Sequence, residues 1–234
     1  MRRYELALTC VWIAATLGAR DACAHRLIQD DGTHTSPASA IALEDFELSQ
    51  VVYHEVRENS NQLWFTFDAV AGQTLHWELG LPALERLDGY RPSLMILGPG
   101  LPEIEAPFEI PEGLGGLVVE VEAEPELFFE PFTGTSSWKL SSGDRSIAQD
   151  GTYYVVAYYP EGTPGKFWVA LGKREEFGLR DVLGYADTIA FVREYHEDSA
   201  APLSVLNWVL LAVSYLAKAL TGPFIPFFSF LWGW

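Results

Sequence analysis

The sequence predicts a mostly β protein: an antiparallel, jelly-roll-like β-sandwich with one helix after its last strand and a C-terminal transmembrane helix. Short apolar or alternating segments recur between residues 50 and 171 and are separated by Gly and Pro, which is typical of sandwiches and barrels. The segment 179–195 has the apolar spacing of a helix. Residues 201–234 contain a single charged side chain, Lys218.

The chain begins with the three-part pattern of a secretory signal peptide. Arginines follow Met1, an apolar run extends over residues 6–19, and Ala22-Cys23-Ala24 supplies the small residues that a signal peptidase recognises. We expect residues 1–24 to be removed on export. Because both cysteines of the chain lie in this segment, the mature domain would have no thiol, which excludes disulfides, thiolate zinc sites and a cysteine nucleophile.

The region between the two ends is expected to be one β-sandwich. Residues 25–49 are polar and predict an extended lead-in with at most one strand, and residues 50–178 form the sandwich, with an acidic, Pro-rich insertion at 98–138. The strand patterns cover residues 50–56, 62–67, 74–79, 92–97, 117–121, 126–130, 136–140, 152–159 and 166–171.

The C-terminal part predicts a helix, a hinge and a membrane anchor. The helix at 179–195 leads into a polar juxtamembrane hinge that ends at residue 200. A second helix over residues 202–217 would be about 24 Å long and would nearly cross a hydrocarbon core of about 30 Å. It has no polar face, which favours the membrane over the alternative, a helix packed on the domain. The side chains expected to hold the 201–234 anchor and its aromatic foot at the interfaces are Trp208, Lys218, Trp232 and Trp234.

Charge and motif content limit the classes of function. The formal net charge is −17, which argues against nucleic acid, because phosphate binding needs clustered Lys and Arg. The acidic surface leaves Ca²⁺ open, although the glutamates of the insertion are spread along the chain rather than gathered in a tight loop. The sequence has no Gly-x-Ser-x-Gly motif and no phosphate-cradling Gly loop followed by Lys, so we do not expect an enzyme.

Two blocks of the sequence resemble bacterial pre-peptidase C-terminal domains. They are QLWFTFDAVAGQTLHWELG at 62–80 and DGTYYVVAYYPEGTPGKFWVALG at 150–172, with a Trp-x-Phe strand, an Ala-Gly-Gln turn and a later Gly-x-Tyr-Tyr strand. The resemblance implies a small jelly-roll-like accessory sandwich of secreted enzymes, often a binding or stabilising module. This chain departs from the pattern because no peptidase domain accompanies it and because of its long insertion, so no functional residue is carried over.

The histidines give one hypothesis of a metal site. Cleavage after Ala24 would leave His25 as the first residue, with both an α-amine and an imidazole. One further histidine (His34, His54 or His76) would complete a copper brace, because amine and imidazole donors suit Cu(II). The alternative is that these histidines are ordinary surface side chains.

Four aromatic residues of the insertion give a second hypothesis. Phe128, Phe129, Phe132 and Trp138 lie close together in sequence, beside small hydroxyl residues. If exposed, they would form a surface that stacks on a glycan or fills a pocket of a partner protein. If buried, they would form a corner of the sandwich core.

The sequence thus predicts a non-enzymatic, extracytoplasmic binding or structural module of a bacterial envelope. Its expected location is the outer face of the inner membrane, with membrane lipid around the tail and another envelope protein or a glycan as partner. The alternative is a periplasmic protein that binds copper or another metal through His25.

Overall fold

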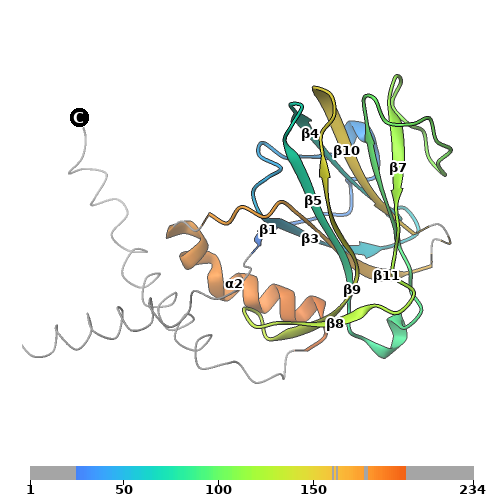
Figure 1. Ribbon diagram of the computed structural model, residues 1–234. Helices are drawn as coiled ribbons and strands as arrows, with labels where there is room; N and C mark the ends of the chain where they lie inside the picture. The colour runs from blue at the N-terminus through green and yellow to red at the C-terminus, as the bar shows by residue number, and fades with distance from the viewer. Residues whose placement is uncertain (1–24, 160, 162, 177–178, 199–234) are drawn as a thin grey trace, which may run out of the picture.

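The computed structural model describes residues 25–159, 161, 163–176 and 179–198 (Figure 1). They form a sandwich of two β-sheets. The first sheet has the strand order β1 (Arg26–Ile28), β3 (Gln50–Val56), β11 (Gly165–Leu171), β5 (Thr74–Pro82), β9 (Thr135–Ser146) and β8 (Glu126–Glu130). The second has the order β2 (Ile41–Ala42), β4 (Gln62–Ala69), β10 (Gly151–Tyr158), β6 (Ser93–Gly98) and β7 (Gly115–Val119). Two 3₁₀ turns, η1 (Pro37–Ser39) and η2 (Glu85–Leu87), lie between strands.

The core lies between the two sheets and follows from alternation along the strands. In β4, Leu63, Phe65 and Phe67 point inward, as the sequence pattern predicts, and all three are buried. Leu75 and Leu79 of β5 meet them from the other sheet. Each predicted strand segment overlaps an observed strand, because this alternation is visible without knowledge of the partner strand.

The predicted fold class is wrong in its sheet type, because both sheets are mixed rather than antiparallel. β1 runs parallel to β3, and β2 runs parallel to β4, each at the edge of its sheet. These short strands come from residues 25–49, which therefore contribute two strands instead of at most one. Parallel neighbours need a long crossover rather than a hairpin. The segment from β1 to β3 provides that crossover, since it contributes β2 to the second sheet before the chain returns to the first.

The predicted transmembrane helix has no counterpart among the residues that the structure describes. In the part of the chain that the structure describes, no helix is long and apolar enough to cross a membrane. The proposed span at 201–234, with Trp208, Lys218, Trp232 and Trp234, lies outside the described residues.

The insertion predicted at 98–138 is part of the sandwich and covers its outer side. It supplies β7 and β8. Its middle part packs on the outer face of the five-stranded sheet, where the rings of Phe108 and Trp64 lie 5.1 Å apart. Trp64 and Met95 are therefore buried although they point away from the main core.

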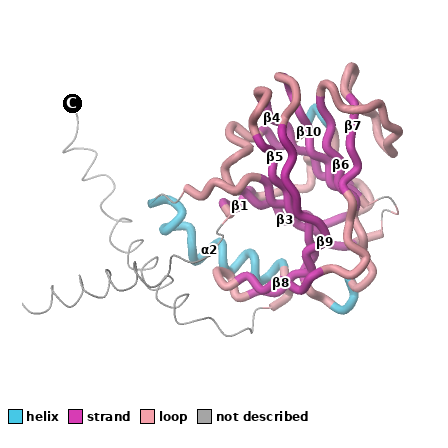
Figure 2. The backbone as a smooth tube through the Cα atoms, in the orientation of Figure 1, coloured by secondary structure: helices cyan, strands magenta, loops and turns pink. Residues whose placement is uncertain are grey.

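One helix, α2 (Leu179–Tyr195), covers part of the outer face of the six-stranded sheet, with the bounds that the sequence predicts. Figure 2 shows it beside β8, and the ring of Tyr185 lies 4.5 Å from that of Phe132 in the β8–β9 turn. At its end, the Tyr195 hydroxyl donates to the carbonyl oxygens of His54 at 2.7 Å and Phe167 at 2.8 Å. α2 is thus fixed to β3 and β11 at one end and to the hairpin in its middle.

Candidate functional site

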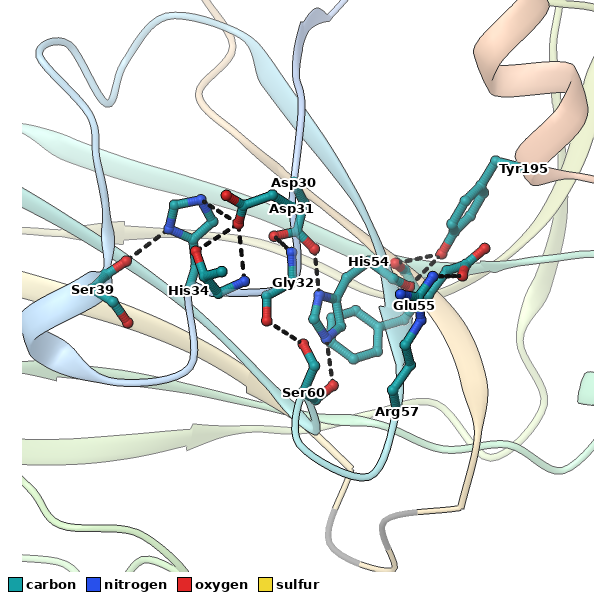
Figure 3. Close-up of polar contacts among 12 residues, drawn as sticks. Asp30, Asp31, Gly32, His34, Ser39, His54, Glu55, Arg57, Ser60 and Tyr195 are labelled. Carbon is teal, nitrogen blue, oxygen red and sulfur yellow. Dashed lines mark hydrogen bonds and ion pairs between the residues drawn. The ribbon is translucent and has the colours of Figure 1, made fainter.

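Two places on the surface carry side chains that could bind a metal or a partner. The first is a cluster of acidic and histidine side chains after β1. Asp30, Asp31 and His34 each offer one ligand atom, and these atoms lie within 4.8 Å of one another. Figure 3 shows this cluster beside His54 and the Ser60 turn. Of the four histidines proposed as metal ligands, the structure brings His34 and His54 to this place.

Asp30 and His54 form a buried ion pair inside this cluster. The parallel register pairs Ile28 with Val52, so that two residues further along, Asp30 lies beside His54. Asp30 Oδ2 is 2.6 Å from His54 Nδ1, and His54 Nε2 is 2.9 Å from the carbonyl oxygen of Ser60. A carbonyl oxygen accepts only, so Nε2 carries a proton, and a second proton lies between Nδ1 and the carboxylate.

The charge of this pair is set by opposing effects on Asp30. Burial opposes ionisation of the Asp30 carboxyl, but the hydrogen bond and charge of His54 and the backbone N–H of Gly32 outweigh it, and the pKa of Asp30 is lowered. Glu55, the residue after His54, points to the opposite face, as its strand position predicts, and pairs with Arg57 at 2.7 Å.

His34 is held so that one ring nitrogen faces the two carboxylates. Its Nδ1 lies 2.7 Å from the carbonyl oxygen of Ser39 and therefore donates to it. Nε2 lies 3.7 Å from Asp31 Oδ1. Asp31 is exposed, and its hydrogen bonds from Thr33 lower its pKa. An imidazole fixed through a backbone carbonyl is the arrangement that metal-binding histidines use.

The other two histidines lie elsewhere, on the outer face of the six-stranded sheet. His76 is buried, with Nδ1 3.0 Å from Asp144 Oδ1 and Nε2 3.8 Å from Glu78 Oε1. His25 Nδ1 lies 2.5 Å from Ser49 Oγ. Burial lowers the pKa of His25, opposed by the carboxylate of Glu78, while the charge of His76 adds to the lowering. His25 thus lies near enough to His76 for the charge of one to affect the other, and the copper brace stays a prediction.

The second feature is the β8–β9 hairpin, which carries all four aromatics of the predicted ligand surface. Phe129 is 58% exposed, whereas the other three are partly buried. The Phe128 ring lies under Lys139 Nζ at 4.8 Å, Phe132 packs on α2, and Trp138 packs on the main core. The sequence hypothesis did not include Leu127, which is 63% exposed. The alternation of β8, which puts Leu127 and Phe129 on one face, was the available signal.

Glu130, the last residue of β8, has an unusual environment for a carboxylate. Burial raises its pKa to about 7, and the carboxylates of Glu78 and Glu175 act in the same direction. The backbone N–H of Phe132, 2.8 Å from Glu130 Oε1, and the charge of Lys139 oppose the rise. Among the residues that the structure describes, the charge of Glu130 is therefore poorly balanced.

Replacing Glu130 by Gln should stabilise the protein above neutral pH. The pKa of Glu130 lies above its unfolded value, so its contribution to folding is fully present below about pH 4.5 and is lost as the pH rises through about 7. Glu130→Gln avoids that loss, and since the group is only half-buried, we expect a gain of about 1–2 kcal/mol near pH 8 and none near pH 4.5. Urea unfolding at both pH values measures it. The exposed Glu126→Gln is the matched control, and an equal gain there would contradict the assignment to Glu130.

A serine–histidine contact lies under the end of α2 and is structural in its surroundings. Ser137 Oγ is 3.0 Å from His196 Nε2 and also accepts from Trp168 Nε1 at 3.1 Å. His196 Nδ1 is 2.7 Å from the carbonyl oxygen of Val192, and burial lowers the pKa of His196 to about 4. Both side chains are buried, so a substrate has no approach to the hydroxyl.

Comparisons with known proteins give a weak structural likeness. No protein-family model and no curated protein match the chain. Among solved structures, the pre-peptidase C-terminal domain of a Bacillus anthracis collagenase is 8% identical at a TM-score of 0.33, over 56% of this chain and 93% of that domain. PliG, a periplasmic inhibitor of g-type lysozyme from Aeromonas hydrophila, is 11% identical at a TM-score of 0.33, over 64% of this chain and 98% of the inhibitor. One of these two structures is a pre-peptidase C-terminal domain, the kind of domain that two blocks of the sequence resemble. Neither likeness bears on function.

Proposed function

We propose that this protein is a non-enzymatic, extracytoplasmic binding module that holds a protein partner on its β8–β9 hairpin. One observation carries the proposal: Leu127 and Phe129 are mostly exposed on one face of a strand at the edge of a sheet. Apolar side chains displayed together on such a strand are typical of interaction surfaces. Val70 and Val118, the other large apolar side chains exposed in the described residues, belong to different loops or strands.

Two further observations support the location and the absence of catalysis. Residues 1–24 have the pattern of a cleaved signal peptide, and the remainder of the chain is acidic. The Ser137–His196 contact, which has the atoms of a nucleophile and a base, is enclosed under α2 and engaged by Trp168. N-terminal sequencing of the exported protein tests the location, and a start at Met1 would contradict it.

Site-specific photo-crosslinking in the producing cells tests the hairpin as the binding surface. A photoreactive amino acid at position 129 should give one discrete adduct with another protein, because Phe129 would lie in the interface. The matched control is the same amino acid at Val118, which is 46% exposed but lies on β7 in the other sheet. Equal adducts at both positions, or none at 129, would contradict the proposal.

A metal-binding protein is the second candidate, favoured by the grouping of Asp30, Asp31 and His34 within 4.8 Å. One imidazole and two carboxylates suit Cu(II) or Zn²⁺ better than Ca²⁺, which prefers oxygen ligands alone. This set and the predicted His25 brace are separate hypotheses, since the structure places His25 with His76.

Cu(II) titration followed by electron paramagnetic resonance distinguishes the two metal hypotheses. If the Asp30 cluster binds, His34→Ala should weaken affinity by about 10-fold or more, whereas His25→Ala should leave it unchanged. If the brace binds, the two variants should exchange roles, and processing must start the chain at His25. Equal affinity of both variants and the parent protein would exclude both sites.

A further inference from the structure

We infer that the partner binds as an extended peptide that adds a strand to β8, with alternating apolar and basic side chains. This inference rests on the proposed function, because it names the partner for the same hairpin. It follows from the free edge of β8, from the two faces of that strand and from the distribution of charge around it.

One edge of β8 is open to a further strand. β8 is the last strand of the six-stranded sheet, and within the described residues it pairs with β9 alone. Along the side away from β9, alternate N–H and C=O groups of a strand point outward and can pair with another extended chain. Addition of a strand to such an edge is a general mode of peptide recognition in which main-chain hydrogen bonds provide affinity.

The two faces of β8 carry different side chains. Leu127 and Phe129 lie on one face, opposite Trp138 and Ser136 of β9. Glu126, Phe128 and Glu130 lie on the other, which is the face toward α2. Successive side chains of an added strand also point to opposite faces. One row of the peptide would therefore lie beside Leu127 and Phe129, and the other beside the two glutamates.

On the glutamate face of β8, Glu130 lies among other acids. Among the described residues, the cation that acts on Glu130 is Lys139, and its Nζ is already 3.0 Å from Glu78 Oε1. The other groups that act on or face Glu130 are the acids Glu78 and Glu175 and the hydroxyls of Tyr53 and Tyr185. A Lys or Arg of the peptide beside Glu130 would balance its charge in half-buried surroundings, where charge-assisted bonds are strong.

The same charges disfavour pairing between two copies of this chain. Antiparallel pairing of two β8 strands would bring Glu126 of one copy opposite Glu130 of the other, and like charges directly opposite one another are destabilising. Exposed Glu122 and Glu124 just before β8 add to the repulsion. The charges along β8 therefore disfavour pairing with a second copy of β8 and favour pairing with a basic strand.

Fluorescence anisotropy with synthetic peptides and the full chain tests the inference. The probe is a peptide of about ten residues that alternates Lys with Val or Phe, as strand addition requires. We expect it to bind at least about 10-fold tighter than the same peptide with Glu for Lys, and about 10-fold tighter than a shuffled sequence without alternation. Affinity should rise between about pH 6 and 8, as Glu130 ionises, and Glu130→Gln should remove this rise.

Two controls locate the peptide and its mode of binding. The double change Leu127→Ser and Phe129→Ser should weaken binding by about 10-fold, whereas Val118→Ser should leave it unchanged. Two methylated peptides are compared, one with N-methyl groups on the odd-numbered residues and one with them on the even-numbered residues. Only one of the two should lose binding, since only one set of backbone N–H groups faces β8. Binding that is unchanged both by the Leu127 and Phe129 substitutions and by either pattern of methylation would overturn the inference, because it would reflect charge alone.

The peptide and crosslinking experiments fail in different ways. An adduct at position 129 in cells, together with no affinity for any alternating basic peptide, would overturn strand addition and leave the proposed binding surface intact. Peptide binding with all the expected controls, but no adduct in cells, would support the chemistry of the edge and contradict the proposed function.

Discussion

Asp30→Ala should destabilise the domain by about 3–5 kcal/mol, because it leaves one member of a buried ion pair without its partner. The side chains of Asp30 and His54 are 5% and 1% exposed, and their atoms lie 2.6 Å apart. Without the carboxylate, a doubly protonated His54 keeps a buried, unbalanced charge, and a neutral His54 leaves the lone pair of Nδ1 without a donor. Either outcome releases the end of β1 from β3.

Urea unfolding measures this effect, and its pH dependence checks the cause. The pKa of Asp30 is lowered, so its contribution is present above the unfolded value and is lost as the pH falls through the folded value. The difference between Asp30→Ala and the parent protein should therefore shrink in acid. Asp31→Ala is the matched control, since Asp31 is adjacent and 70% exposed, and its removal should cost much less than that of Asp30. Equal losses for the two variants would show that the ion pair contributes little.

Gly80→Ala should cost about 2–3 kcal/mol through overpacking under α2. A Cβ on Gly80 would lie 2.2 Å from Cζ2 of Trp168 and 2.8 Å from the carbonyl oxygen of Trp138. Trp168 is buried, and its ring N–H bonds to Ser137, so the ring cannot move without breaking that contact. Gly80 also lies where the β5–β9 register shifts. The strain therefore reaches β9, which is one strand of the β8–β9 hairpin.

Gly184 in α2 provides a control substitution for which the opposite sign is expected. Among the described residues, a methyl group on Gly184 would have no atom within 4 Å beyond its own helix backbone and chain neighbours, and Ala is the better helix former by about 1 kcal/mol. Gly184→Ala should therefore raise the thermal midpoint while Gly80→Ala lowers it. Thermal unfolding of the two variants side by side measures both signs. If Gly184→Ala lowered the thermal midpoint as much as Gly80→Ala, the loss at Gly80 could not be attributed to overpacking against Trp168.

The Asp30 variant also separates stability from binding. The Asp30–His54 pair lies beside β1 and β3, at the opposite edge of the sheet from Leu127 and Phe129, so folded Asp30→Ala protein should keep its affinity for the alternating basic peptide. The two changes at the hairpin should act in the reverse way, with reduced affinity and little change in unfolding, because both side chains are already exposed.

Local patterns were enough to predict the strands and the helix at 179–195. Alternation in β4 and β10 and the helical spacing of α2 depend on neighbouring residues alone, and these elements appear with bounds close to those expected. The four aromatics at 128–138 were also found as a group from the sequence, but the sequence could not show that only Phe129 is displayed. That distinction depends on what packs against each ring, such as Tyr185 against Phe132.

The sequence by itself determined the mostly β character, the acidic surface and the order of the elements, because each follows from composition or from the side-chain period along one segment. Tertiary structure alone decided that β1 and β2 pair in parallel, that Asp30 meets His54, and that Glu130 lies among other acids beside a free edge. Each of these joins residues far apart in the chain, and strand register, rather than local propensity, brings them together. The proposed binding surface belongs to this second group, since exposure of Leu127 exists only once the sheet ends at β8.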